Sequence, residues 1–299
     1  MPNTILPGDV SLWSPDIHSA YANEAVWQTR FMANRVKRLD ADVLKKNMLV
    51  EIHDITPHLQ AVNLGADGAL SFSKIPQNVV QLQVTEEPHV AYQIDRRVDF
   101  QNLENVQAIH AKAGGEELQE YLERFLIKLH PGLAAAFRTP CTDITKTQLG
   151  IAKRKMDRML VKARNRHFIT SVEQQCTMVL TEDFSSVKWQ GMGYMGAGMK
   201  KGELSDMVLG FEPLYTTLNN DTTVIDHSGD GGVNGAYYTS MVWTDEAIGC
   251  AVQKSVMTDG PIKSETHTRV TYWMLSVFGA RLIRLASAPW AVAIDHVNP

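Results

Sequence analysis

The sequence predicts an α+β fold, and three stretches carry that prediction. Residues 48–94 alternate apolar and polar side chains with the period of two that β-strands show. Residues 99–130 instead repeat apolar side chains every three to five positions, as one face of a long helix does. Residues 266–285 favour β-structure and are apolar on both faces, which is typical of a strand at the centre of a covered sheet.

The composition limits the classes of function. The chain has 299 residues, of which 44% are apolar, and this is enough to fill a core. Cys141, Cys176 and Cys250 form no paired motif, so we expect a reducing compartment without disulfides or a zinc site. We expect no signal peptide, because residues 1–10 have no basic residue followed by an apolar run. We expect no membrane anchor, because the longest charge-free apolar run elsewhere, 285–294, is too short to span a bilayer. A net charge of -4 argues against a dedicated nucleic-acid binder.

The chain begins with a predicted arm and a predicted hairpin. Residues 1–20 hold several prolines among few periodic apolar positions, which favours extended chain. Residues 21–46 follow with the apolar spacing of a helix and with several basic side chains. In 48–94 the alternating runs flank the turn sequence Gly65-Ala66-Asp67-Gly68, which predicts a two-faced hairpin or small antiparallel sheet. Such a half-polar hairpin buries little by itself, so we expect a partner to cover it.

The long helix predicted over 99–130 would extend roughly 40 Å or more. Its apolar face comprises Leu103, Val106, His110, Ala113, Leu118, Leu122, Phe125 and Leu129. Gly114 and Gly115 interrupt the pattern at a cost of roughly 1 kcal/mol each, and they predict a bend midway. Pro131 and Gly132 end the helix.

A second helix is predicted from about residue 143 or 145 to residue 164, where Thr145 and Gln148 have the spacing of a capping box. Its apolar face comprises Leu149, Ala152, Met156, Met159, Leu160 and Ala163. The other face is basic, with Lys146, Lys153, Arg154, Lys155, Arg158, Lys162, Arg164 and Arg166 against the single acid Asp157. This concentration indicates a contact with something negative, although a solvated face explains the same pattern, since no aromatic residues are interleaved to stack on bases.

The remaining chain predicts several short elements. A buried strand over 167–171 precedes a helix over 172–181, and strands over 236–243 and 248–256 are separated by the turn at 244–246. A Gly-rich section lies between this helix and the first of these two strands, and its residues Gly191–Gly198 match the G-x-G-x-x-G pattern. Glu212 lies near the position expected of a ribose-binding acid. A dinucleotide loop must follow a buried strand and open a helix, and neither is indicated here. A flexible loop is the better account.

No other motif predicts catalysis or metal binding. Residues 226–234 resemble half of a calcium loop, but Tyr237 occupies the position of its closing acid. The neighbours Asp226, His227 and Ser228 have no serine elbow to complete a triad. His53 and His58 lack companion ligands, and the adjacent carboxylates Glu86 and Glu87 point apart in a turn. We therefore predict no catalytic, cofactor-binding or metal-binding residue, and this favours a structural or assembly role.

The order of the elements resembles that of the major capsid proteins of tailed bacteriophages, which share the Hong Kong ninety-seven type fold with herpesvirus capsids. The segments that carry the resemblance are the hairpin, 91–95 with the long helix, 143–173, 209–214, 238–252, 268–285 and 288–294. The resemblance implies an N-terminal arm over 1–47 and an extended β-hairpin loop over 48–94. It also implies a peripheral domain with a long spine helix over 95–166, completed by 266–299, and an axial domain over 167–265.

The resemblance also implies a function. A member of this family is a coat protein without enzymatic activity or cofactor, which self-assembles into pentamers and hexamers of an icosahedral head around double-stranded DNA. The sequence has no long charged extension before the arm, so we expect either a separate scaffolding protein or assembly without one. A portal and a decoration protein are expected as further partners, and no membrane is expected. The expected location is the virion, assembled in the host cytoplasm. Candidate residues for non-specific contact with DNA, or for contact with the scaffold or the adjacent subunit, are Lys153, Arg154, Lys155, Arg158 and Lys162.

Two other accounts of the sequence stay open. One is an encapsulin-like shell of a cellular compartment, which has the same fold. The other is a nucleotide-dependent enzyme that uses the loop Gly191–Gly198.

Overall fold

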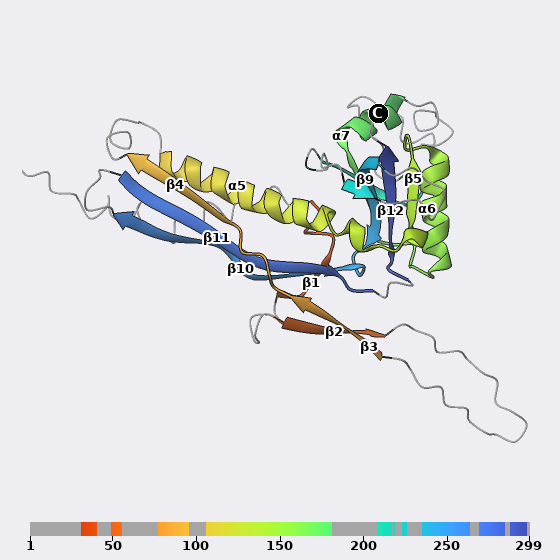
Figure 1. Cartoon of the computed structure of the whole chain (residues 1–299), viewed down its shortest axis with the longest axis horizontal. Helices are drawn as coiled ribbons and strands as arrows, with labels where there is room; N and C mark the ends of the chain where they lie inside the picture. The colour runs from red at the N-terminus through yellow and green to blue at the C-terminus, as the bar shows by residue number, and fades with distance from the viewer. Residues whose placement is uncertain are drawn as a thin grey trace, which may run out of the picture.

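The structure is a computed structural model that describes residues 31–40, 49–55, 77–95, 106–180, 208–216, 218, 223–225, 235–263, 269–284 and 288–297. These residues form two larger sheets, a separate hairpin and the helices that pack on the sheets (Figure 1). The α+β class predicted from the sequence is confirmed.

The first sheet lies under the longest described helix, α5 (Val106–Ile127) (Figure 1). Its four strands run in the order β1-β10-β11-β4, with β10, β11 and β4 antiparallel and β1 parallel to β10. Their bounds are Lys37–Arg38 for β1, Ile248–Lys263 for β10, Arg269–Leu282 for β11 and His89–Asp95 for β4. Leu118 and Leu122 of α5 are buried against this sheet, where Met274 and Phe278 of β11 meet the helix.

The second sheet has six strands in the order β5-β12-β9-β6-β7, with β8 paired to β9. Their bounds are Arg138–Cys141 for β5, Ala291–Val297 for β12, Gly235–Thr244 for β9, Arg166–Ser171 for β6, Glu212–Thr216 for β7 and Thr223–Ile225 for β8. Helix α6 (Lys146–Arg158) covers β5 and β12, and α7 (Val172–Leu180) follows β6. Two 3-10 turns, His130–Gly132 and Ala135–Phe137, connect α5 to β5.

The hairpin of β2 (Leu49–Ile55) and β3 (Gln77–Gln83) projects away from both sheets (Figure 1). The antiparallel pair confirms the hairpin predicted from the alternating pattern, while its predicted turn at 65–68 lies outside the described residues. Its base is anchored, because Val50, Ile52 and Leu82 are buried in one cluster with Val277 of β11.

Helix α5 differs from the predicted helix in its C-terminal end and in some residues of its buried face. Its described part ends at Ile127, and residues 96–105 lie outside the described residues. His110 and Ala113 were predicted on the apolar face, but both are exposed, and Ala111 is buried instead. The helix is continuous through Gly114, where a Cβ would collide with Met274 Cε, so this glycine permits a close approach of helix and sheet. A bend that varies between subunits stays a prediction.

Helix α6 begins as predicted and ends earlier than predicted. Thr145 Oγ1 accepts a hydrogen bond from Gln148 N at 3.4 Å, which confirms the predicted cap. The helix ends at Arg158 rather than at 164, because the backbone of Leu160 turns into the left-handed region at φ 55°. Leu160 and Ala163 therefore leave the buried face on which they were predicted, and both are exposed.

The helical pattern over 21–46 is a wrong prediction where the structure tests it. Residues 31–39 form bends, a turn and β1, and only Asp40 is helical, while 21–30 and 41–46 lie outside the described residues. The physical reason is that backbone N–H groups of this segment donate to other elements, as Met32 N does to Glu123 and Leu39 N to Cys250 O.

The β-strands predicted in the second half of the chain are confirmed, and β10 and β11 are long. β11 lies between β10 and β4, which agrees with the central position predicted for it. The four proposed domain boundaries stay predictions. Strand pairing crosses the proposed divisions, since β1 pairs with β10, β11 pairs with both β10 and β4, and β12 pairs with β9.

Candidate functional site

The basic surface predicted on the second helix is divided by the structure into free and engaged side chains. Arg154, Arg158 and Lys162 are exposed, and Lys153 is half-buried. Lys155 points inward, because its Nζ donates to Arg138 O at 2.9 Å and to Thr139 Oγ1 at 3.0 Å. Four of the five candidate residues therefore remain for an outside contact, and Lys155 ties α6 to β5.

The chain after α6 forms a short shaped loop, residues 159–165, which we call the α6 loop. Arg166 is buried and holds this loop, since its guanidinium donates to Val161 O at 2.6 Å and to Lys162 O at 3.0 Å and pairs with Asp157 at 2.7 Å. Leu160 projects from the loop with 87% of its surface exposed. The sequence predicted neither the loop nor the exposed leucine, because Leu160 has the spacing of the apolar face of the helix.

A second surface of opposite charge lies between α5 and the start of β4. This acidic hollow has a volume of about 390 Å³. Its lining comprises Glu86, Glu87, Pro88, His89, Val90, Glu117, Leu118 and Tyr121. The Tyr121 hydroxyl donates a hydrogen bond to Glu86 Oε2 at 3.0 Å, and this bond raises the pKa of Tyr121. The hollow thus combines carboxylates with an apolar floor from Leu118 and Val90.

The segment 31–40, which we call the base segment, is held by a buried carboxylate. Glu123 of α5 is 0% exposed, and its oxygens accept from the backbone N–H groups of Phe31, Met32 and Ala33 at 3.3, 2.9 and 3.1 Å. Gln119 Nε2 donates to the same carboxylate at 3.0 Å. Burial raises the pKa of Glu123 to about 6. Periodicity offered no signal for this residue, since glutamate is common on the solvated face of helices.

A row of hydrogen-bonded side chains from Arg35 through Glu212 and His167 to Asp245 holds the other side of the base segment. Arg35 binds Glu212 of β7 through two hydrogen bonds of 3.0 and 2.6 Å. His167 Nδ1 lies 2.7 Å from Glu212 Oε2, and its Nε2 lies 2.6 Å from Asp245 Oδ1. The hydrogen bond from Arg35 lowers the pKa of Glu212. Because Glu212 is engaged in this way, it does not support the nucleotide interpretation of the Gly-rich section.

The candidate motifs of the Gly-rich loops receive no structural test. Gly191–Gly198 and residues 226–234 lie outside the described residues. Within the part of the chain that is described, no group of three or more His, Cys, Asp and Glu side chains is placed to hold a metal ion. Among the same residues, no helix is long and apolar enough to cross a membrane.

Cys141 and His296 lie together as a nucleophile and its base would, with Sγ 3.2 Å from Nδ1. Burial raises the pKa of the Cys141 thiol to about 12 and lowers the pKa of His296 to about 4. Both groups are therefore neutral near pH 7, whereas an activated cysteine requires a thiolate. His296 Nε2 instead lies 2.9 Å from Ser240 Oγ, within the interior of the second sheet.

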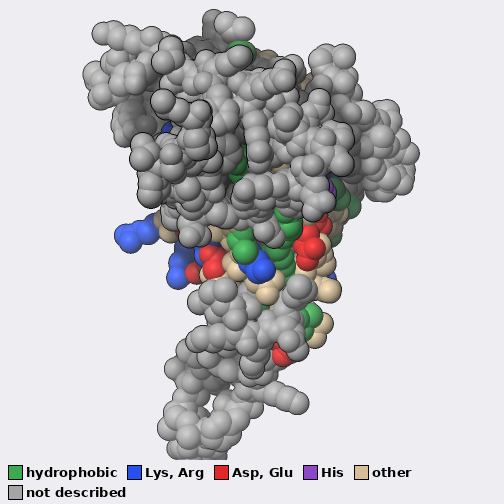
Figure 2. Space-filling model, turned by 90° about the vertical axis from the view of Figure 1, so that its left-hand side faces the viewer, with side chains coloured by type: hydrophobic (Ala, Val, Ile, Leu, Met, Phe, Trp, Pro, Cys, Tyr) green, Lys and Arg blue, Asp and Glu red, His purple; other side chains and the backbone are tan. Residues whose placement is uncertain are grey.

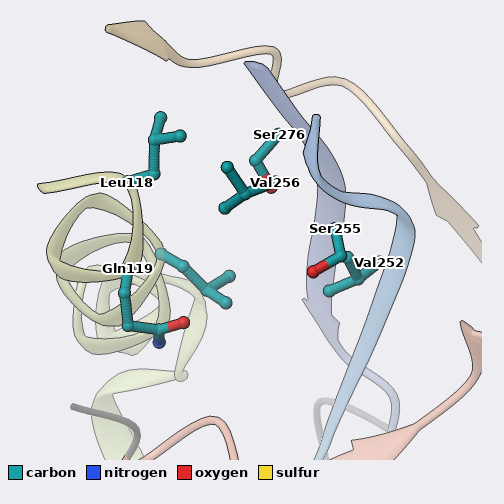
Figure 3. Close-up of a pocket in the computed structure, with 7 residues that line it drawn as sticks. Leu118, Gln119, Val252, Ser255, Val256 and Ser276 are labelled. Atoms are coloured by element: carbon teal, nitrogen blue, oxygen red, sulfur yellow. The ribbon is translucent and has the colours of Figure 1, made fainter. Parts of the chain in front are cut away.

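A small cavity lies between α5 and the first sheet, within their packed interface. Figure 3 shows Leu118 and Gln119 on the helix facing Val252, Ser255 and Val256 of β10. Its volume is about 10 Å³, which has room for about one water molecule and none for a larger ligand.

Where described residues are visible on this side of the molecule, basic, acidic and hydrophobic side chains lie next to one another (Figure 2). This part of the molecule has no uniform sign of charge. By contrast, the exposed side of α6 and the α6 loop, which we call the α6 surface, is mainly basic, and the acidic hollow holds three glutamates.

Comparison with known proteins shows what this arrangement is similar to. No family model and no curated protein sequence matches the chain. A solved structure of Mycobacterium phage Che8 matches with a TM-score of 0.64 and 15% identity, over 88% of this chain and 90% of that chain. The mature capsid of bacteriophage PhiM1 matches with a TM-score of 0.64 and 11% identity, over 91% and 88%. A virus-like particle from Pyrococcus furiosus matches with a TM-score of 0.56 and 10% identity, over 93% and 98%.

Proposed function

Since this chain has the Hong Kong ninety-seven type fold of phage capsid structures, we propose that it is a coat subunit that assembles into a closed shell. The observation that carries the proposal is the extent of the similarity, which covers 88% of this chain and 90% of the Che8 chain. Nearly all of the chain is thus accounted for by a fold that builds shells in its structural neighbours.

The shape of the chain supports the same function. A closed shell of identical chains needs contacts that repeat around rings, made by a rigid body and by extensions that reach the next subunit. Here the two sheets form the body, and the β2–β3 hairpin projects from it. Leu49 and Val79 on the hairpin are 38% and 48% exposed, and a neighbouring subunit would cover them.

The finer features belong to the same proposal. The shell is an icosahedral head of pentamers and hexamers that encloses double-stranded DNA, forms in the host cytoplasm and becomes part of the virion. A separate scaffolding protein and a portal assist assembly, and a decoration protein binds the finished head. The subunit performs no catalysis and needs no cofactor.

The basic α6 surface is the proposed contact with a negative partner. Lys153, Arg154, Arg158 and Lys162 remain accessible to DNA, scaffold or an acidic surface of the next subunit. Replacing Lys153, Arg154, Arg158 and Lys162 by Gln lowers assembly yield or genome retention, which particle counts and packaged DNA measure. Normal particles from this variant would contradict the contact.

Electron microscopy tests the coat-protein proposal directly. The chain is expressed alone and together with the products of its neighbouring genes, and closed shells of uniform size are expected. A chain that stays monomeric under every assembly condition contradicts the proposal. Shells that form without scaffold and contain protein cargo instead support the compartment shell, for which the similarity to the Pyrococcus furiosus particle is the favouring observation.

The enzyme alternative has its own test. A dinucleotide that binds the native chain raises its melting temperature by mass action. We expect no shift, and a reproducible increase would favour the nucleotide interpretation.

A further inference from the structure

We propose that the α6 loop of one subunit inserts Leu160 into the acidic hollow of the next subunit. This contact rests on the proposed function, because it names the two surfaces through which the coat subunits meet. The occupant of the hollow is therefore a second copy of this chain.

Leu160 occupies a conformation that the isolated chain does not favour. Its φ of 55° lies in the left-handed region, which bulky side chains avoid and glycine or asparagine adopts readily. Its side chain is also 87% exposed, so leucine gains no burial there. An observed backbone outlier of this kind supports a functional hypothesis, because the local strain must be offset by another interaction. Burial of the side chain in a partner supplies that interaction.

The α6 loop is held in shape before any partner binds. The buried Arg166 side chain donates to Val161 O and Lys162 O, directly after the exposed leucine. At the other end of the loop, Asn165 Nδ2 donates to Asp245 Oδ2 at 2.9 Å. A preformed loop loses little conformational entropy on binding, so Leu160 is presented ready to dock.

The acidic hollow matches this loop in size and chemistry. Its volume of about 390 Å³ lies within the range of about 300 to 1000 Å³ typical of pockets that enclose a small ligand. Leu118, Val90 and Pro88 give it apolar walls for a leucine side chain. Glu86, Glu87 and Glu117 add negative charge to the same hollow.

The charges around Leu160 have the opposite sign. Arg158, Lys162 and Arg164 are exposed beside it, so each would approach a carboxylate when the leucine enters the hollow. Such complementarity steers the two surfaces together and disfavours wrong partners. A DNA backbone would satisfy these cations too, but it offers no apolar surface for the central leucine. The combination of leucine and cations therefore favours a protein partner.

The position of the two surfaces gives the contact its symmetry. The loop follows α6 on the second sheet, whereas the hollow lies between α5 and β4 on the first sheet. A contact between two different surfaces of the same chain is heterologous, and it closes into a ring when the rotation per subunit allows. Pentamers and hexamers are rings of this kind.

The first test removes the leucine without disturbing the fold. Leu160→Gly suits the positive φ, so the unfolding midpoint of the free subunit stays equal or rises, while the critical concentration for shell formation rises at least about tenfold, equivalent to about 1.4 kcal/mol per contact. Leu160→Met keeps an apolar side chain and serves as the control with near-normal assembly. Normal assembly of Leu160→Gly overturns the proposal.

The second test exchanges the charges. Arg158→Glu with Lys162→Glu, and separately Glu87→Lys with Glu117→Lys, each reduce assembly, whereas the variant that carries all four changes regains it. A fourfold variant that assembles no better than either pair overturns the contact. If the Arg158→Glu, Lys162→Glu variant forms normal shells that retain less DNA, the α6 surface contacts DNA and the proposal is wrong.

A crosslink identifies the geometry. His89 is exposed in the hollow, so Leu160→Cys and His89→Cys in one chain form a disulfide between neighbours when assembled shells are oxidised. Non-reducing gel electrophoresis should show a ladder of crosslinked oligomers that ends at the size of a complete ring. Each single-cysteine variant gives the background of crosslinks that the native cysteines form. No ladder above that background contradicts the contact. Wild-type shells are measured in parallel: if they never form, the coat function fails, and if only the crosslink fails, the inference alone does.

Discussion

At the scale of single residues, Glu123 determines how the base segment docks. A carboxylate in the interior is costly unless its oxygens accept hydrogen bonds, and here three backbone N–H groups and Gln119 provide them. The acceptor lies on α5, and the donor at Met32 lies 91 residues earlier in the chain. The residue therefore links the base segment to the long helix.

Glu123 predicts a specific dependence of stability on pH. Burial raises its pKa from 4.5 to about 6, so the native state binds this proton more tightly than the unfolded state. The stabilisation, about 2 kcal/mol, is fully present below the unfolded pKa and is lost as pH rises through about 6. The free energy of unfolding, measured by denaturant from about pH 4 to pH 8, should show this loss in the wild type.

The control for this prediction is Glu123→Gln, which does not titrate. The buried His130 and His296 have lowered pKa values of about 3 and about 4, and they act in the opposite direction, because the unfolded state takes up their protons as pH falls below 6.5. Both chains share these histidines, so the difference between wild type and Glu123→Gln isolates Glu123. A difference that is constant with pH would show that the carboxyl does not titrate in this range.

Gly114 predicts the sign of an alanine substitution. A Cβ there would collide with Met274 Cε, the end of a flexible but buried side chain, so the methionine must shift within packed surroundings, and Gly114→Ala should lower the free energy of unfolding by about 1 to 3 kcal/mol. Gly150 in α6 has no atom within 4 Å of its Cβ position, so Gly150→Ala should raise stability by about 0.5 to 1 kcal/mol. Chemical denaturation of both variants compares them. Equal effects would mean that helix propensity, and not packing, governs both sites.

At the scale of elements, the hairpin is attached to the body through its base. Leu82 on β3 is 0% exposed and lies in the cluster that includes Val277 of β11 and Ala251 of β10. Two strands alone are marginally stable in water, so this cluster accounts for the order of the described hairpin. The exposed residues Leu49 and Val79 lie outside that cluster.

The hairpin base predicts a contrast between two truncations. Leu82→Ala leaves a cavity in a packed cluster and should cost about 2 to 5 kcal/mol. Val79→Ala on the same strand, where the side chain is 48% exposed, should change the stability of the free subunit by less than about 0.5 kcal/mol. Thermal unfolding of the monomer measures both, and hydrogen exchange reports whether β2 and β3 lose protection. Similar costs would place the two side chains in equivalent surroundings, against the structure.

At the scale of the whole molecule, the proposed contact joins two surfaces of opposite charge on identical chains. The α6 surface is basic and the acidic hollow lies on another part of the chain. Added salt should therefore weaken assembly, since the Debye length falls from about 10 Å at 0.1 M to about 3 Å at 1 M. Light scattering should show a higher critical concentration in high salt.

The charge variants provide the comparison for this salt effect. The Arg158→Glu, Lys162→Glu variant has lost the attraction, so salt should leave its poor assembly unchanged or improve it. A wild type that assembles equally well at both salt concentrations would indicate that apolar contacts alone hold the shell together.

Local features of the chain could be predicted because they depend on neighbours in sequence. The alternation in 77–83, the cap at Thr145 and the buried strand predicted over 167–171 each follow from residues within one short window. The helix end at Arg158 was missed, since the bonds of Arg166 to Val161, Lys162 and Asp157 replace the helical pattern after it.

By itself, the sequence determined the α+β class, the order of the elements and the resemblance to capsid proteins, because side-chain periodicity and turn chemistry act locally. Only the tertiary structure decided which strands share a sheet, that Lys155 and Glu123 serve inside the subunit, and that Leu160 projects from it. The reason is physical: burial and pairing depend on groups that meet in space from distant parts of the chain, and the pattern of one segment does not contain its partners.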